Sequence, residues 1–363
     1  MASSAPLEMQ GILAAVGETP LVRLHTLSEL TGREIYGKAE HLNPAGSVKD
    51  RAAKFLVLDA FKRGLLVPGD TIVEGTGGNT GIALAMVASA LGLRTLITVP
   101  DNVAKEKRDM MERYGAEILV VPQVPFSNPE HFYHAAKRER DRMNADADKA
   151  MSTLPQGSPR PPRAYFPDQF ENLANREAHR ATTGPEIWRQ TSGKVNAFVC
   201  ASGTGGTISG VSSYLKEQDS RVRIVLADCH GSGLASFVQT GELVSDGLKT
   251  VTEGIGSMRL TANFKSAAID ECVRVSDAEA VAMGYFLLQF EGIFIGPSAS
   301  LNAAAAVKVA RTLPAGSTIV TIMCDSGERY TSKTFNKGFL QEQQLQPAFD
   351  ANGRLPRNLD FVL

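Results

Sequence analysis

Short apolar runs alternate along most of this chain with longer stretches of helical periodicity, and no other feature restricts the fold as strongly. Strands are predicted near residues 35–38, 71–74, 95–99, 117–121, 197–201, 223–227 and 318–323, and helices near 48–63, 79–92, 103–114, 129–144, 206–217, 277–290 and 299–312. This alternation is typical of βαβ units, in which parallel strands form a sheet with helices on both faces. The sequence therefore predicts an α/β fold with mostly parallel sheets.

Charge and composition argue against several classes of protein. The 363 residues carry a formal net charge of -1, so no overall positive field attracts nucleic acid or an anionic membrane. The longest apolar stretch, residues 82–99, is interrupted by Ser89, Gly92 and Arg94, which fits a helix and a strand better than a membrane span. Residues 1–10 lack the pattern of a secretory signal or a transit peptide. We expect a cytoplasmic protein, or a mitochondrial one if a targeting segment has been removed.

The four cysteines and six histidines form no recognisable ligand set. The cysteines are widely spaced without a CxxC pair, which argues for a reducing compartment and against a disulfide framework. No HExxH or comparable pattern is present, so no metal site is predicted.

Two segments differ from the regular alternation. Residues 152–163 are rich in proline, serine and arginine, and they predict an exposed excursion or flexible flap. Residues 231–256 are rich in glycine and weakly periodic, and they predict a loop. Scaffolds often carry their binding residues on such loops, so both segments are candidate neighbours of a functional site.

Residues 43–51 read Asn-Pro-Ala-Gly-Ser-Val-Lys-Asp-Arg, which predicts a turn followed by a helix that begins at Val48 with Ser47 as its cap. Lys49 then lies near the helix N-terminus, where the helix dipole disfavours the ammonium form. A neutral lysine is a nucleophile that forms Schiff bases with aldehydes and ketones. A surface lysine in the first turn of the helix is the simpler alternative. Lys49 therefore indicates a functional site only in combination with other motifs.

Two glycine-rich turns each connect a predicted strand to a predicted helix. Residues 75–81 read Gly-Thr-Gly-Gly-Asn-Thr-Gly, and residues 202–207 read Ser-Gly-Thr-Gly-Gly-Thr. Backbone N–H groups and hydroxyls at a helix start bind anions. The second turn lacks the lysine of a P-loop and the spacing of a dinucleotide fingerprint, so a single phosphate group fits it best. A tight turn that merely needs glycine is the alternative for the first.

Ser298 lies in residues 296–300, Gly-Pro-Ser-Ala-Ser, and is either the N-cap of the next predicted helix or a polar group of a site. In an open α/β sheet the carboxyl ends of the strands line the ligand crevice, so these motifs can converge. A helix-start lysine, a phosphate turn and a turn suited to a carboxylate together suggest a phosphorylated aldehyde cofactor that acts on an amino acid.

These motifs follow the order of a known family. From Gly-Glu-Thr-Pro-Leu-Val at residues 17–22 to Tyr330, the chain resembles the fold type II pyridoxal-phosphate enzymes, most closely the cysteine synthases (O-acetylserine sulfhydrylases) and the catalytic core of cystathionine β-synthase. The resemblance implies pyridoxal 5'-phosphate as cofactor and a tryptophan-synthase-β-like architecture of two three-layer αβα domains. It also implies a homodimer.

The resemblance further implies where the domains lie. The smaller N-terminal domain would span residues 43–172, with a mobile part at about 95–160. The larger domain, which binds the cofactor phosphate, would combine residues 21–42 with 173–335. Residues 336–363 would form a C-terminal tail.

A role for each motif residue also follows from the resemblance. Lys49 would carry the cofactor as an internal aldimine and move the substrate α-proton, and Ser298 would face the pyridine nitrogen. The cofactor phosphate would be bound by Gly203, Thr204, Gly205, Gly206 and Thr207, and the 3'-oxygen by Asn79. The substrate carboxylate would be bound by Thr76, Gly77, Gly78, Asn79, Thr80 and Gln169.

A serine beside the pyridine nitrogen does not enforce a protonated ring, so the cofactor is a weaker electron sink than it is beside an aspartate. The negative charge that develops at Cα is then relieved by loss of a leaving group from Cβ. The implied reaction is β-replacement, which forms L-cysteine from O-acetyl-L-serine and sulfide through an aminoacrylate intermediate.

The chain departs from the family pattern at three places. Gly77 stands where a serine is usual in the carboxylate turn, and Ser300 replaces a common glycine. The stretch from about residue 126 to 163 is longer than in compact members. The leaving group, the nucleophile and the role of this insertion therefore stay open.

Several other functions fit these motifs less well. Cystathionine β-synthase, which uses serine and homocysteine, is the nearest alternative, but the chain shows no haem-binding extension and only a short tail after Tyr330. A serine/threonine dehydratase fits residues 79–81 less well. A catalytically weak scaffold would not need all four of Lys49, Asn79, Thr207 and Ser298. A nicotinamide-dependent oxidoreductase would need the absent dinucleotide fingerprint.

Overall fold

The computed structural model describes residues 11–363, which form two compact units. The first unit comprises residues 11–16 and 49–174, and the second comprises residues 17–48 and 175–363. Each unit is organised around one β-sheet of its own. The predicted domain bounds and the predicted mobile part stay predictions.

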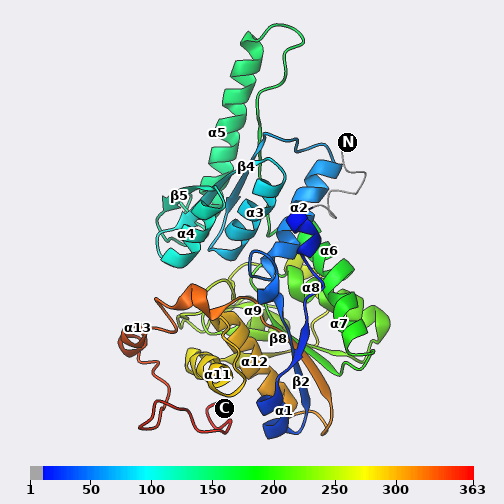
Figure 1. Ribbon diagram of the computed structural model, residues 1–363, viewed down its shortest axis with the longest axis vertical. Helices are drawn as coiled ribbons and strands as arrows, with labels where there is room; N and C mark the ends of the chain where they lie inside the picture. The colour runs from blue at the N-terminus through cyan, green and yellow to red at the C-terminus, as the bar shows by residue number, and fades with distance from the viewer. Residues whose placement is uncertain (1–10) are drawn as a thin grey trace. The chain divides into compact units, whose positions relative to one another are not determined.

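The first unit contains a four-stranded parallel sheet in the order β5-β4-β3-β6. Its strands are β3 (Thr71–Gly75), β4 (Arg94–Pro100), β5 (Glu117–Val121) and β6 (Ala164–Tyr165), and its helices are η2 (Gly11–Ala15), α2 (Lys49–Lys62), α3 (Asn79–Ala90), α4 (Lys105–Arg113) and α5 (Phe132–Thr153). Val73 and Leu96 pack with Tyr133 of α5, whereas Ile97 lies against Gly81 of α3. Helices therefore cover both faces of this sheet, as α3 and α5 do in Figure 1.

Helix α5 continues well beyond the strands that it covers (Figure 1). Its first turns are buried at Tyr133 and Ala136, whereas residues 148–153 are exposed. The predicted irregular segment begins at residue 154, later than expected, because α5 extends to Thr153. The Asp70 carboxylate holds the end of this segment, since it pairs with the Arg160 guanidinium at 2.7 Å and accepts the Arg163 backbone N–H at 2.8 Å.

The second unit contains a six-stranded sheet in the order β1-β2-β10-β7-β8-β9, in which only β1 is antiparallel to its neighbour. Its strands are β1 (Leu21–Arg23), β2 (Glu34–Lys38), β7 (Ala197–Ala201), β8 (Arg223–Cys229), β9 (Glu271–Val275) and β10 (Thr318–Ile322). Its helices are α1 (His25–Thr31), η3 (Glu40–Leu42), α6 (Ala174–Ala178, which begins at the unit boundary), η4 (His179–Thr183), α7 (Gly184–Gln190), α8 (Gly206–Gln218), α9 (Leu234–Thr240), α10 (Ala262–Lys265), α11 (Asp277–Phe290), α12 (Pro297–Ala310), η5 (Gly327–Tyr330) and α13 (Lys337–Glu342).

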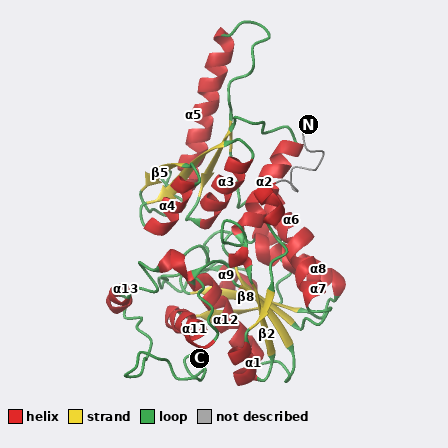
Figure 2. Ribbon diagram, viewed as in Figure 1, coloured by secondary structure: helices red, strands yellow, loops and turns green. Residues whose placement is uncertain are grey.

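Alternate residues of the central strands supply two separate hydrophobic cores. In β7, Ala197 and Val199 face the core built with α11 and α12, whereas Phe198 and Cys200 face the core built with α8. This period of two is the expected pattern of a strand buried on both faces. Figure 2 shows the strands of this sheet between the two groups of helices.

The carboxyl ends of the parallel strands share one edge of the sheet, and two functional segments are fixed there. The Val48 N–H donates to the Cys324 carbonyl at 2.9 Å, and the Gly296 N–H donates to the Asp325 carbonyl at 3.0 Å. The segment that precedes Lys49 and the segment that precedes Ser298 are therefore both attached to the chain that follows β10.

The predicted α/β fold with mostly parallel sheets is confirmed, and each of the seven predicted strands is present to within two residues. The short strands β1, β6 and β9 were not predicted. The prediction of a loop across residues 231–256 is wrong in part, because α9 forms within it. Leu234 and Ala235 of that helix are fully buried, and this packing outweighs the weak local periodicity.

No helix among residues 11–363 combines the length and the apolar composition that a bilayer span requires. Within the same residues, no three His, Cys, Asp or Glu side chains are grouped so that they could hold a metal ion.

Asn302 connects two strands beneath the carboxyl edge of the second sheet. Its side chain is fully buried, accepts the Ala201 N–H at 2.7 Å and donates to the Ile322 carbonyl at 2.9 Å. We predict that Asn302→Ala lowers the free energy of unfolding by about 2–4 kcal/mol, because it leaves two buried backbone groups unpaired. Urea denaturation measures this loss, and Gln341→Ala, at an exposed amide of α13, is the control. A loss below about 0.5 kcal/mol would contradict the assigned role.

Candidate active site

The turn between β7 and α8 has no room for side chains at three of its positions. A Cβ atom on Gly203 would lie 2.1 Å from the Gly254 carbonyl oxygen, and one on Gly206 would lie 2.1 Å from Asn175 Oδ1. On Gly205, whose φ is +90°, a Cβ atom would lie 2.5 Å from the Phe264 backbone. The backbone of this turn is thus closely packed on its neighbours, and only glycine fits.

This turn presents backbone donors rather than a charged side chain. Gly205 is the N-cap of the 13-residue helix α8 and provides no side-chain cap, and the Gly206 N–H donates to the Thr204 hydroxyl at 3.4 Å. The Thr204 hydroxyl accepts a hydrogen bond from Asn175 Nδ2 at 2.9 Å. Backbone N–H groups, threonine hydroxyls and the positive end of a helix dipole fit a phosphate group. The residues present therefore suit a phosphate ester.

His179, four residues after Asn175, contacts the last residue of this turn, Thr207. His179 is buried, and its Nε2 lies 3.2 Å from the Thr207 hydroxyl while its Nδ1 lies 2.9 Å from the Thr183 hydroxyl. His179 opens a short π-helix, His179–Thr183, an element that is frequent at functional sites. The predicted phosphate turn is therefore supported by Asn175 and His179, neither of which was predicted.

Ser298 is the second residue of α12 and is buried. The N-cap of that helix is Gly296, so the structure does not support Ser298 as a cap. Among the described residues its hydroxyl has no hydrogen-bond partner. The side chain is therefore available to bind a ligand atom.

The turn between β3 and α3 forms the candidate site of the first unit. The Thr76 hydroxyl accepts the Gly78 N–H at 3.1 Å, and Asn79 is the first residue of α3. A Cβ atom on Gly78 would lie 2.5 Å from the side chain of Lys107, a buried lysine of α4. Gly77, by contrast, is exposed and has no neighbour within 4 Å of where its Cβ would be. The turn is therefore tightly packed at Gly78 and open at Gly77.

The structure brings Thr80 and Gln169 together, although they lie far apart in the sequence. The Thr80 hydroxyl donates to Gln169 Oε1 at 2.5 Å, and Gln169 Nε2 donates to the Gly75 carbonyl at 3.1 Å. Both side chains are buried. Gln169 thus fixes both ends of the turn that was predicted to bind a carboxylate.

Beneath this turn lies Glu74, a buried carboxyl group that was not predicted to matter. It accepts the Asp168 N–H at 3.0 Å and lies 3.4 Å from Gln169 Nε2. Burial, together with the negative charge of Asp168, raises the pKa of Glu74 to about 8. The sequence signal for Glu74 is an acidic residue within a short predicted strand, and the structure shows every residue of that strand to be buried.

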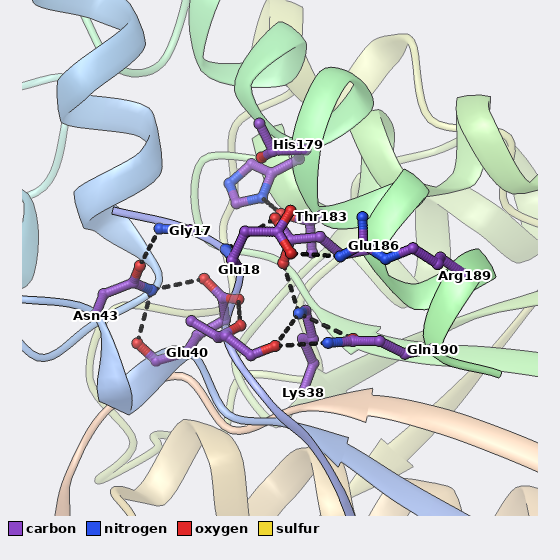
Figure 3. A network of polar contacts seen from close by, with 12 residues as sticks. Gly17, Glu18, Lys38, Glu40, Asn43, His179, Thr183, Glu186, Arg189 and Gln190 are labelled. Atoms are coloured by element: carbon purple, nitrogen blue, oxygen red, sulfur yellow. Dashed lines mark hydrogen bonds and ion pairs between the residues drawn. The ribbon is translucent and has the colours of Figure 1, made fainter. Parts of the chain in front are cut away.

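Lys49 is the first residue of α2, one position later than the predicted start of that helix. The segment before it is held in the second unit by a buried polar network (Figure 3). Asn43 accepts the Gly17 N–H at 3.0 Å and donates to Glu40 at 2.8 Å, and Glu40 accepts the Thr19 hydroxyl at 2.7 Å.

The same network contains a fully buried ion pair. Lys38 lies 2.6 Å from the Glu186 carboxylate of α7 and also donates to the Thr19 carbonyl. Removing one partner of such a pair would leave an uncompensated buried charge. The position of residues 40–48, which lead to Lys49, therefore depends on this ion pair.

Comparison with known proteins identifies the family. Residues 12–325 match the family described as pyridoxal-phosphate dependent enzymes. The chain is 45% identical to cysteine synthase 1 of Neurospora crassa, over 93% of this chain and 86% of that protein, and 45% identical to cysteine synthase of Dictyostelium discoideum over the same shares. The solved structure of an O-acetylserine dependent cystathionine beta-synthase from Helicobacter pylori superposes with a TM-score of 0.75 at 32% identity, covering 92% of this chain and 99% of that one.

The chain therefore belongs to the pyridoxal-phosphate-dependent enzymes, and its cofactor is pyridoxal 5'-phosphate. The close-packed turn of residues 203–206 fits the phosphate of that cofactor. The roles of the individual residues stay predictions.

The raised pKa of Glu74 predicts how stability depends on pH. Between about pH 5 and pH 8 the folded protein keeps a proton that the unfolded chain releases, so stability falls as pH rises through this range. Glu74→Gln should remove this dependence, because an amide does not titrate. Thermal melts of wild type and variant across the range measure it.

Glu117→Gln, at an exposed position of β5 in the same sheet, is the matched control and should keep the pH dependence of wild type. Parallel pH profiles of wild type and Glu74→Gln would contradict a protonated Glu74.

Proposed function

We propose that this protein is a cysteine synthase, which forms L-cysteine and acetate from O-acetyl-L-serine and sulfide. The observation that carries the proposal is the turn before α8, in which no Cβ fits at Gly203, Gly205 or Gly206, in a chain that is 45% identical to cysteine synthases over 93% of its length. A phosphate-bearing cofactor fits that turn, and the relatives bear the name of the reaction.

The cofactor-binding residues follow from the turns described above. Lys49 binds the cofactor aldehyde through Nζ, and Ser298 contacts the pyridine nitrogen. The phosphate is bound by Gly203, Thr204, Gly205, Gly206 and Thr207, and the 3'-oxygen by Asn79. The substrate carboxylate is bound by Thr76, Gly77, Gly78, Asn79, Thr80 and Gln169.

The reaction replaces the acetoxy group at Cβ by a thiol group. When bound, pyridoxal phosphate supplies an electron sink for the electron pair of the Cα–H bond. Lys49 Nζ would leave the cofactor aldehyde when the substrate amine takes its place. As a free amine it would accept the Cα proton as acetate leaves, and it would return a proton to Cα after sulfide has added to Cβ. Ser298 has no negative charge and does not hold a proton on the pyridine nitrogen. The protein thus favours loss of a β-substituent.

The oligomeric state and the cellular location are further parts of the proposal. A homodimer is proposed from the family resemblance, and sedimentation of the purified protein tests it. A cytoplasmic location is proposed because the four cysteines are thiols and form no disulfide with one another, which suits a reducing compartment.

Lys49→Ala tests the proposed mechanism directly. We predict loss of the visible absorbance of the lysine-bound cofactor and a fall in turnover of at least about a hundredfold, because both covalent binding and the proton transfer are lost. The far-ultraviolet circular dichroism spectrum should stay unchanged. Lys62→Ala, at an exposed lysine of the same helix, is the control. Full activity in Lys49→Ala would overturn the mechanism.

Gly77→Ser tests the departure from the usual carboxylate turn. The open space at Gly77 admits a side chain, so the cofactor should remain bound. An added hydroxyl can donate to the substrate carboxylate, and we predict a KM for O-acetylserine lower by up to about tenfold. Gly77→Ala adds only the methyl group and should leave KM unchanged. Equal kinetics for Gly77→Ser and wild type would show that the departure is neutral.

A further inference from the structure

The two threonines of the phosphate turn are each contacted by a side chain from one neighbouring stretch. Asn175 lies on Thr204, and His179, four residues later, lies on Thr207. The spacing of four places both side chains on one face of the helical stretch 174–183. This face packs on α8, because Asn175 occupies the space above Gly206 and His179 Cβ lies 2.7 Å from where a Cβ of Gly210 would be. The contact is thus set by backbone packing, not by a flexible surface side chain.

A hydroxyl can donate only one hydrogen bond, so its neighbours decide where that hydrogen points. Asn175 Nδ2 donates to Thr204 Oγ1, which leaves the Thr204 hydrogen free for a ligand. The same arrangement at Thr207 requires that His179 Nε2 carry a hydrogen and donate to Thr207 Oγ1. If Nε2 carried no hydrogen, it would accept the hydrogen of the Thr207 hydroxyl. That hydrogen would then point away from the ligand.

Thr183 can determine which ring nitrogen of His179 carries the hydrogen. Its hydroxyl is fully buried and lies 2.9 Å from His179 Nδ1, so it can donate to that nitrogen and place the ring hydrogen on Nε2. Figure 3 shows His179 beside Thr183, next to the Lys38 network. A continuous set of hydrogen bonds then runs from Thr183 through the imidazole ring to Thr207.

We propose that His179 is a positioning residue, which donates from Nε2 to Thr207 Oγ1 and thereby directs the Thr207 hydroxyl hydrogen to the phosphate of the cofactor. This inference rests on the proposed phosphate site. His179 acts through Thr207 in this proposal, so its effect is confined to the phosphate end of the ligand. It therefore distinguishes pyridoxal phosphate from pyridoxal, which lacks the phosphate.

The test compares the affinities of the apoprotein for pyridoxal phosphate and for pyridoxal, both followed by the absorbance of the ligand bound to Lys49. His179→Leu should weaken binding of pyridoxal phosphate by about tenfold, the usual size of a lost charged hydrogen bond, and leave binding of pyridoxal unchanged. His179→Gln retains a side-chain N–H donor and should restore most of the affinity. The ³¹P resonance of the bound cofactor should shift in His179→Leu and lie near the wild-type position in His179→Gln.

Thr183→Val is a second variant that leaves the imidazole in place. It should weaken binding of pyridoxal phosphate alone, by less than His179→Leu, because the ring can then adopt the wrong tautomer. If His179→Leu does not fold, Thr183→Val with His179→Gln decides the question, and full affinity for pyridoxal phosphate in Thr183→Val would overturn the proposal.

Other outcomes also overturn it. Equal losses for both ligands, or a His179→Gln variant as weak as His179→Leu, would show a merely structural role for His179. Such results would leave the proposed function intact, since wild type would still bind pyridoxal phosphate. Wild-type protein that binds neither ligand at Lys49 would overturn the proposed function and this inference with it.

Discussion

The close approach of the Gly203–Gly206 backbone to its neighbours is the constraint on which the second unit's site depends. Because no Cβ fits at Gly203, Gly205 or Gly206, the turn after β7 packs directly on the backbone and side chains around it. The first N–H groups of α8 are then held in place without a charged side chain. A preorganised set of donors of this kind binds an anion without the cost of ordering flexible side chains.

Around this turn the fold uses buried polar contacts to set orientation. Asn302 joins β7 to the end of β10, Asn175 and His179 contact the threonine hydroxyls, and the Lys38–Glu186 ion pair supports the segment that leads to Lys49. In the first unit, Gln169 plays a similar part for the turn after β3, with Glu74 beneath it. Each unit thus contains one glycine-rich turn whose geometry is fixed by contacts with buried side chains.

The sequence predicted seven of the ten described strands, the two turns and the family, because these depend on local periodicity and on glycine at particular positions. It failed where tertiary packing decides. Helix α9 forms in a glycine-rich stretch because Leu234 and Ala235 find a core, and β9 was missed because Glu271 and Arg274 interrupt its apolar pattern. The partners of the phosphate turn could not be predicted either, since Asn175 and His179 lie 29 and 28 residues before the threonines that they contact.

The central claim is that this chain uses pyridoxal phosphate to exchange the β-substituent of O-acetylserine for sulfide. The most direct measurement is the absorbance spectrum of the purified protein, recorded before and after adding O-acetylserine and again after adding sulfide. The account predicts a visible band of bound cofactor that changes with O-acetylserine and returns with sulfide, as cysteine is released. A protein that shows no such band after incubation with pyridoxal phosphate, or a band that O-acetylserine does not change, would contradict it.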